Sequence, residues 1–150
     1  MIVEQNFISK SSYFSDEAHV FKLAISASNF LGFLPHHPIR KNDSFEAFEE
    51  ILKKARNCNA DLLVLGGNLF AESSPSQEIL TKSIALLKEN IFGDKPINYE
   101  VLWGKKAPNY ACENMNIDLP IFAIHGKNEG KFAEEFNVLD VLNAGNYVIF

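Results

Sequence analysis

The sequence lacks the features of several special protein classes. It has no apolar run close to the roughly 20 residues that a membrane-spanning helix needs. Its two cysteines, Cys58 and Cys112, are too few for a disulfide framework and lack the spacing of a metal site, so they suit a reducing compartment. Residues 1–18 show neither the apolar core of a signal peptide nor the Arg-rich face of a transit peptide. We therefore expect an intracellular protein with no membrane partner.

Positive charge is also scarce, because 14 Lys and Arg residues stand against 19 Asp and Glu residues, for a net charge of −5. This balance argues against strong non-specific DNA binding by the chain alone. A composition that is 47% hydrophobic and 22% charged is typical of a soluble globular protein. The length of 150 residues suits one domain. We expect a polar leader over residues 1–18 and a single domain over residues 19–150.

Strand-like and helix-like patterns alternate along the domain. Short apolar runs predict strands, and apolar residues at helical spacing predict helices. The predicted strands cover residues 19–27, 62–65, 97–103, 120–125 and 147–150, and the predicted helices cover residues 43–57, 75–92 and 134–143. This order is typical of an α/β fold with a mostly parallel sheet flanked by helices.

Two of these helices carry start signals in the sequence. Asp43 followed by Glu46 predicts a capping box at the first helix. At the second helix, Pro75 suits the first helical position, Gln77 is placed to complete a cap, and Gly93 suits the end.

Ligand and metal sites in such folds lie at the carboxyl ends of the strands. Three segments occupy these places, namely 28-SNFLGF-33, 66-GGNLF-70 and 125-HGKNEG-130. The second segment raises a question, because Gly66 and Gly67 form a platform suited to a catalytic carboxylate while Asn68 provides a neutral amide.

The three segments together resemble the calcineurin-like metallophosphoesterases, which carry Asp-x-His-Leu-Gly, Gly-Gly-Asp-Leu-Phe and His-Gly-Asn-His-Asp at these strand ends. The similarity covers nearly all of residues 20–150 and is to the N-terminal half of the SbcD-like nucleases of double-strand-break repair. It includes 42-NDSFEAFEEIL-52, 75-PSQEILTKSIALL-87 and 117-IDLPIFAIHG-126. The resemblance implies a partial αββα sandwich, a truncated form of the family domain.

The resemblance also implies a centre with two manganese ions, but the expected ligands are replaced in this chain. The ligand-equivalent positions carry Ser28, Phe30, Asn68 and Lys127, and the position of the general acid carries Asn128. Phe30 has no lone pair, Asn68 lacks the charge of a bridging carboxylate, and the ammonium of Lys127 repels cations. We therefore expect no intact metal site, no metal cofactor and no catalytic residue.

Other potential ligands have simpler explanations. Ala71 and Glu129 replace a His and an Asp of the family motifs, and Glu129 in a loop is expected to be solvated. The neighbouring His36 and His37 are expected to lie exposed in a Pro-flanked loop. His125 is expected to pack or to bond to the backbone.

Partners are implied only by the resemblance. The segment Gly93–Asp118 looks like the insertion with which eukaryotic members hold the regulatory subunit nibrin, and its candidate contact residues are Trp103, Lys105, Lys106 and Tyr110. Two helices resemble those that form the family dimer, with candidate contacts at Phe45, Phe48, Leu52, Leu80, Ile84 and Leu87. A heterodimer with an active member is an alternative to a homodimer. The resemblance further implies a nuclear location and a zinc-hook SMC-like ATPase partner, mainly through regions absent here, and it leaves DNA contact open.

Three functional hypotheses follow. The first is a catalytically inactive relative that acts as a dimerisation and partner-binding scaffold in DNA repair. The second is an active metal-dependent phosphodiesterase with unusual ligands, motivated by the glycine turns and by Glu129, His36 and His37. The third is a decayed half-domain with no function.

Overall fold

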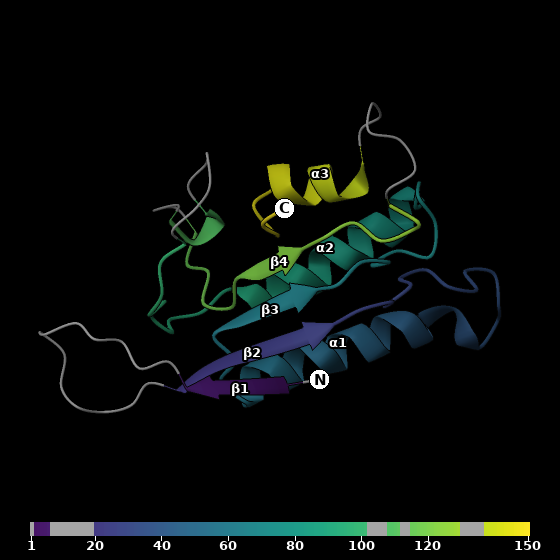
Figure 1. Cartoon of the computed structure of the whole chain (residues 1–150). Coiled ribbons are helices and arrows are strands. Elements are labelled where there is room, and N and C mark those ends of the chain that lie inside the picture. The colour runs from purple at the N-terminus through teal and green to yellow at the C-terminus, as the bar shows by residue number, and fades with distance from the viewer. Residues whose placement is uncertain (1, 7–19, 102–107, 112–114, 130–136) are drawn as a thin grey trace, which may run out of the picture.

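A computed structural model describes residues 2–6, 20–101, 108–111, 115–129 and 137–150. Strands and helices alternate along most of these residues (Figure 1). The strands are β1 (Ile2–Asn6), β2 (Val20–Ser26), β3 (Leu62–Leu65) and β4 (Ile121–Ala123). The α-helices are α1 (Asp43–Asn57), α2 (Gln77–Ile91) and α3 (Val138–Ala144), and short 3-10 turns cover Arg40–Asn42 and Asn109–Ala111. No helix in the described ranges is long and apolar enough to span a membrane.

The strands form one sheet in the order β1-β2-β3-β4. β2, β3 and β4 run parallel, and β1 joins the edge as an antiparallel strand, with Ile2 opposite Ala24. The predicted α/β fold with a mostly parallel sheet is therefore confirmed, as is its agreement with a partial metallophosphoesterase sandwich. The strand at Ile2–Asn6 was not predicted, because it lies in the segment expected to be a polar leader.

Several predicted elements differ from the structure. Residues 97–101 of the predicted strand 97–103 form no strand, and the last two lie outside the described residues. The predicted strand 147–150 is reduced to one parallel bridge, between Ile149 and Phe122. The third helix begins at Val138, because Asn137 has extended backbone angles and caps it, and residues 134–136 of the predicted helix lie outside the described residues. Its side chain accepts from Leu139 N at 3.0 Å, while the Asp140 carboxylate accepts from Asn137 N at 3.0 Å.

The predicted caps of the first two helices are also displaced. Asp43 lies inside α1 and makes no capping box; its carboxylate instead accepts a 2.8 Å hydrogen bond from Arg40 Nε. Ser76 caps α2 by accepting from Ile79 N at 3.4 Å, so Pro75 precedes the cap instead of opening the helix. α2 ends at Ile91, two residues before Gly93.

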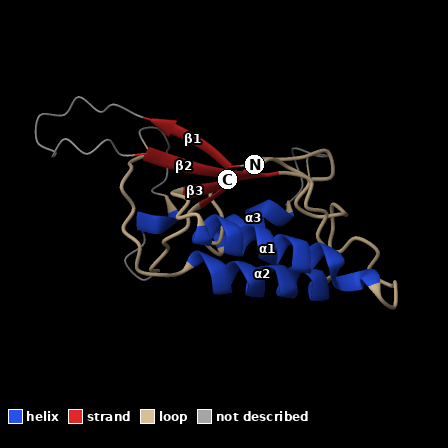
Figure 2. Cartoon of the chain, turned by 90° about the horizontal axis from the view of Figure 1, so that it is seen from below, coloured by secondary structure: helices blue, strands red, loops and turns tan. Residues whose placement is uncertain are grey.

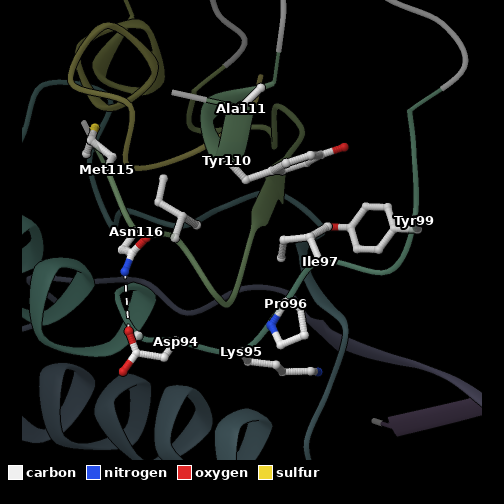
Figure 3. Close-up of a pocket in the computed structure, with 11 residues that line it drawn as sticks. Asp94, Lys95, Pro96, Ile97, Tyr99, Tyr110, Ala111, Met115 and Asn116 are labelled. Carbon is white, nitrogen blue, oxygen red and sulfur yellow. Dashed lines mark hydrogen bonds between the residues drawn. The ribbon is translucent and has the colours of Figure 1, made fainter. Parts of the chain in front are cut away.

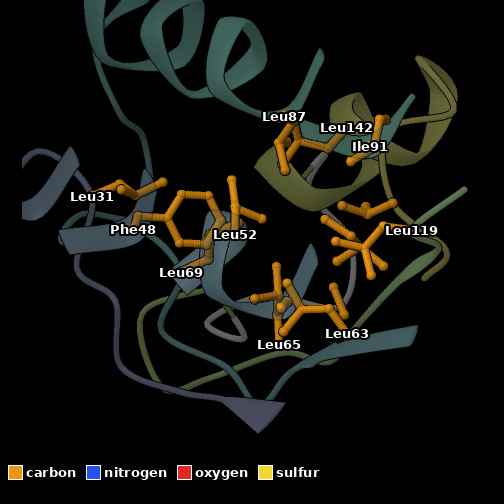
Figure 4. Packing of buried hydrophobic residues seen from close by; sticks show 14 of the residues in the cluster. Leu31, Phe48, Leu52, Leu63, Leu65, Leu69, Leu87, Ile91, Leu119 and Leu142 are labelled. Atoms are coloured by element: carbon orange, nitrogen blue, oxygen red, sulfur yellow. The ribbon is translucent and has the colours of Figure 1, made fainter. Parts of the chain in front are cut away.

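The helices all pack on one face of the sheet (Figure 2). Strand residues that alternate along the chain point to this face, among them Ala24, Leu63 and Ile121, which are at most 5% exposed. They meet Phe48, Leu52 and Leu87 of the helices in a continuous apolar core (Figure 4). This burial of one sheet face against amphipathic helices is the main source of stability.

A polar clamp ties the helices to the segment that leads into β4. Arg56 near the end of α1 donates to both carboxylate oxygens of Asp118, at 2.8 and 3.1 Å. The same guanidinium donates to the carbonyls of Asn90 and Phe92 at the end of α2. It thus satisfies carbonyls that the end of a helix leaves without partners.

Candidate functional site

The three segments singled out in the sequence meet at one edge of the sheet, because β2, β3 and β4 are parallel and all end there. The loops after β2 and β3 continue to pair beyond the strands. Ser28 N donates to Gly67 O at 2.9 Å, and Phe30 N donates to Asn68 O at 3.1 Å. The structure therefore brings Ser28, Phe30 and Asn68, three of the positions expected to correspond to metal ligands, onto neighbouring backbone segments.

The backbone at these positions is unusual. Ser28, Phe30 and Asn68 have φ values of 57°, 49° and 52°, in the left-handed region that bulky residues rarely adopt. Next to them, a Cβ on Gly67 would lie 2.7 Å from Gly126 Cα, so both loops need glycine to approach so closely. The edge thus keeps a strained, closely packed architecture, of the kind that clusters at functional sites.

Glu129 lies at the centre of this edge and is not solvated, contrary to expectation, because it is only 6% exposed. Its Oε2 accepts from Asn68 N and from Gly126 N, each at 2.8 Å. Its Oε1 accepts from Phe70 N at 3.1 Å. The sequence offered no signal for this role, since two of the three donors are backbone groups of the loop after β3.

Asn128 joins the same two loops. Its side-chain Nδ2 donates to Ala71 O at 2.9 Å and to Phe70 O at 3.3 Å. Its backbone N–H donates to Asn68 Oδ1 at 3.1 Å. The side chain expected at the general-acid position is therefore used in cross-linking, and an amide in this setting has no proton to give to a leaving group.

The residues present do not fit two manganese ions. Manganese prefers carboxylate, imidazole and carbonyl donors, and no cluster of three or more His, Cys, Asp or Glu side chains exists among the described residues. Phe30 offers no donor and instead lines an apolar hollow of about 510 Å³, together with Asn29, Phe33, Asp43, Ser44 and Ala71. The carboxylate of Glu129 already accepts three hydrogen bonds.

The histidines lie apart from this edge or have other partners. His36 is exposed, and His37 Nδ1 accepts from the backbone N–H groups of Ile39 and Arg40, at 3.2 and 3.1 Å. His125 stacks on Phe150 with ring centroids 4.3 Å apart, and its Nδ1 lies 3.3 Å from Asn137 Nδ2.

The segment with the expected partner contacts is described in part. Trp103, Lys105 and Lys106 lie outside the described residues. Tyr110 borders a hollow of about 500 Å³ that lies between residues 93–99 on one side and residues 110–111 and 115–117 on the other (Figure 3). Tyr99 forms the facing wall, with its ring centroid 5.6 Å from that of Tyr110 and 5.5 Å from that of Phe21. Burial raises the pKa of both tyrosines, so both phenols stay protonated at neutral pH. The sequence prediction missed Tyr99, which it placed in a strand.

The expected dimer contacts lie largely inside this chain. Phe48, Leu52 and Leu87 are at most 1% exposed and Phe45 is 8% exposed, so these four side chains form its own core. Leu80 and Ile84 pack against that core and remain partly accessible. Of the six expected dimer contacts, only Leu80 and Ile84 are therefore accessible to a second chain.

Comparison with known proteins identifies relatives of the chain, although no protein-family model matches it. Double-strand break repair protein MRE11 is 35% identical over 143 residues in Mus musculus, 37% over 143 residues in Coprinopsis cinerea and 32% over 142 residues in Arabidopsis thaliana. These matches cover 86 to 89% of this chain but 20% of each relative, so the chain spans about one fifth of their length. Together with the parallel sheet and its strand-end loops, this similarity makes the chain a relative of the MRE11 family of double-strand break repair proteins.

Proposed function

We propose that this protein is a catalytically inactive MRE11 relative that serves as a binding component in double-strand break repair. The observation that carries the proposal is the set of side chains at the strand ends. Ser28, Phe30 and Lys127 supply no anionic or imidazole donor, and Asn68 and Asn128 are hydrogen-bonded to each other or to the neighbouring loop. Without such donors, no metal-activated water and no stabilisation of a phosphoryl transition state is available.

The binding role is proposed for the segment Gly93–Asp118. The walls of its hollow combine apolar side chains, such as Ile97 and Met115, with the two facing tyrosines, which suits a protein partner. By family relationship the partner is a nibrin-like regulatory subunit. Dimerisation with a second copy or with an active family member, association with the family's ATPase and a nuclear location belong to the same proposal.

A manganese titration followed by calorimetry tests the catalytic half of the proposal. The wild-type chain is expected to give no binding heat at millimolar manganese and no cleavage of single- or double-stranded DNA. Saturable binding with metal-dependent cleavage would refute inactivity and would favour a phosphodiesterase with unusual ligands.

A titration with a peptide from a nibrin-like subunit tests the binding half. We expect saturable binding that the substitution Tyr110→Ala weakens, because this side chain borders the hollow. Phe33→Ala is the matched control, since Phe33 is a 55% exposed aromatic residue that borders the other hollow instead. Absence of binding by a cooperatively folded wild-type chain would refute the scaffold role and would favour a decayed domain.

A further inference from the structure

One buried carboxylate contributes several of the hydrogen bonds that hold the strand-end edge together. Glu129 accepts hydrogen bonds from Asn68 and Phe70 in the loop after β3 and from Gly126 in the loop after β4. Hydrogen bonds to an ionised acceptor are about twice as strong as neutral ones. Buried backbone N–H groups that lost this acceptor would remain without partners. Glu129 therefore joins two loops that no regular ladder joins at this point.

The side chain of Asn68 converges on the same place. A Cβ on Gly126 would lie 2.5 Å from Asn68 Oδ1, and Gly126 N donates to Glu129 Oε2. The backbone N–H of Asn68 donates to that same carboxylate oxygen at 2.8 Å. The side-chain oxygens of residues 68 and 129 thus both flank Gly126.

A charge at position 68 would consequently affect the stability of this edge. A carboxylate there would stand beside the buried carboxylate of Glu129, and two like charges in a poorly solvated site repel unless cations lie between them. The neutral amide of Asn68 removes that repulsion while its Oδ1 still accepts from Asn128 N. Asn also tolerates the left-handed backbone that this position requires.

We propose that Asn68 and Glu129 form a metal-independent latch, in which a neutral amide allows a buried carboxylate to hold the strand-end loops together. In this latch Asn68 has a stabilising role, because its neutral amide lets the edge stay closed without the cations that an acidic residue would need. This inference concerns the stability of the edge and stands independently of partner binding.

A double-mutant cycle on the whole chain tests the latch. Asn68→Asp is expected to lower the midpoint of thermal unfolding by about 3 to 8 °C at neutral pH. In the Glu129→Gln background, the same change is expected to cost less than half as much, because the repelling charge is gone. Asn98→Asp is the matched control, since Asn98 is exposed, and it is expected to cost the same in both backgrounds.

Two further measurements keep the test decisive. Amide hydrogen exchange at Asn68, Phe70 and Gly126 is expected to rise at least tenfold in Glu129→Gln relative to the rest of β3 and β4. Manganese is expected to leave the unfolding midpoint of the wild-type chain unchanged, since a ligand that binds only the folded state would raise it. Equal costs of Asn68→Asp in both backgrounds, unchanged exchange at these amides, or stabilisation by manganese would each overturn the latch.

Discussion

The clamp between Arg56 and Asp118 makes a prediction whose size follows from burial. Removing the carboxylate with Asp118→Ala takes away two hydrogen bonds, at 2.8 and 3.1 Å, from a side chain that is only 9% exposed. The guanidinium would keep its bonds to the carbonyls of Asn90 and Phe92 but would lose its counter-charge.

The expected loss of stability is smaller than that for a fully buried ion pair. Breaking a fully buried ion pair costs about 3 to 5 kcal/mol, because one charge is left without compensation. The side chain of Arg56 is 33% exposed, so water screens part of that loss. We expect Asp118→Ala to lower the free energy of unfolding by about 2 to 3 kcal/mol.

Urea unfolding followed by circular dichroism measures this cost. The ion pair between Lys82 and Glu78 provides the control, because it has the same 2.8 Å separation but its side chains are 43% and 75% exposed. A pair so exposed contributes little, so Glu78→Ala should change stability far less than Asp118→Ala. Equal effects of the two substitutions would refute the argument that burial gives the clamp its strength.

The remaining predictions concern Gly93, Tyr99 and the strand-end edge. Gly93→Ala should destabilise the chain by roughly 1 to 3 kcal/mol in urea unfolding, because its Cβ would lie 2.0 Å from Asp118 Oδ2; no loss would contradict that packing. Tyr99→Phe should be neutral or stabilising by up to about 1 kcal/mol at pH 7, since its buried hydroxyl has no hydrogen-bond partner in the described part of the chain. Burial raises the pKa of Tyr99 in the folded state, so its contribution is intact below the unfolded pKa of about 10 and is lost as the pH rises further. Unfolding curves on both sides of pH 10 should therefore show a smaller alkaline loss for Tyr99→Phe than for the wild type. A variant with Ser28→Asp, Phe30→His, Asn68→Asp and Lys127→Asn should bind manganese in calorimetry where the wild type does not; absence of binding would mean that the edge no longer has the geometry of a metal site.

Local sequence patterns predicted the elements that depend on local physics. Apolar residues at helical spacing located α1 and α2, and the short run Leu62–Leu65 located β3. The alternation of these elements was enough for the α/β class, because parallel strands need helical crossovers. Predictions failed where distant residues decide, as at residues 97–101, where Tyr99 packs on Phe21 and Tyr110 and no strand pairing forms.

The residue types at the three strand ends can be read from the sequence alone, and with them the expectation that the metal ligands of the family are replaced. What these side chains contact became visible only in the folded chain. The local sequence predicts a solvated Glu129, because two of its donors, Asn68 and Phe70, lie 61 and 59 positions away along the chain. Hydrogen bonds from distant backbone N–H groups to a side chain leave no trace in the local pattern, since every residue type except proline supplies an N–H. The stabilising role proposed for Asn68 therefore follows only from the fold, which places this residue beside a buried carboxylate.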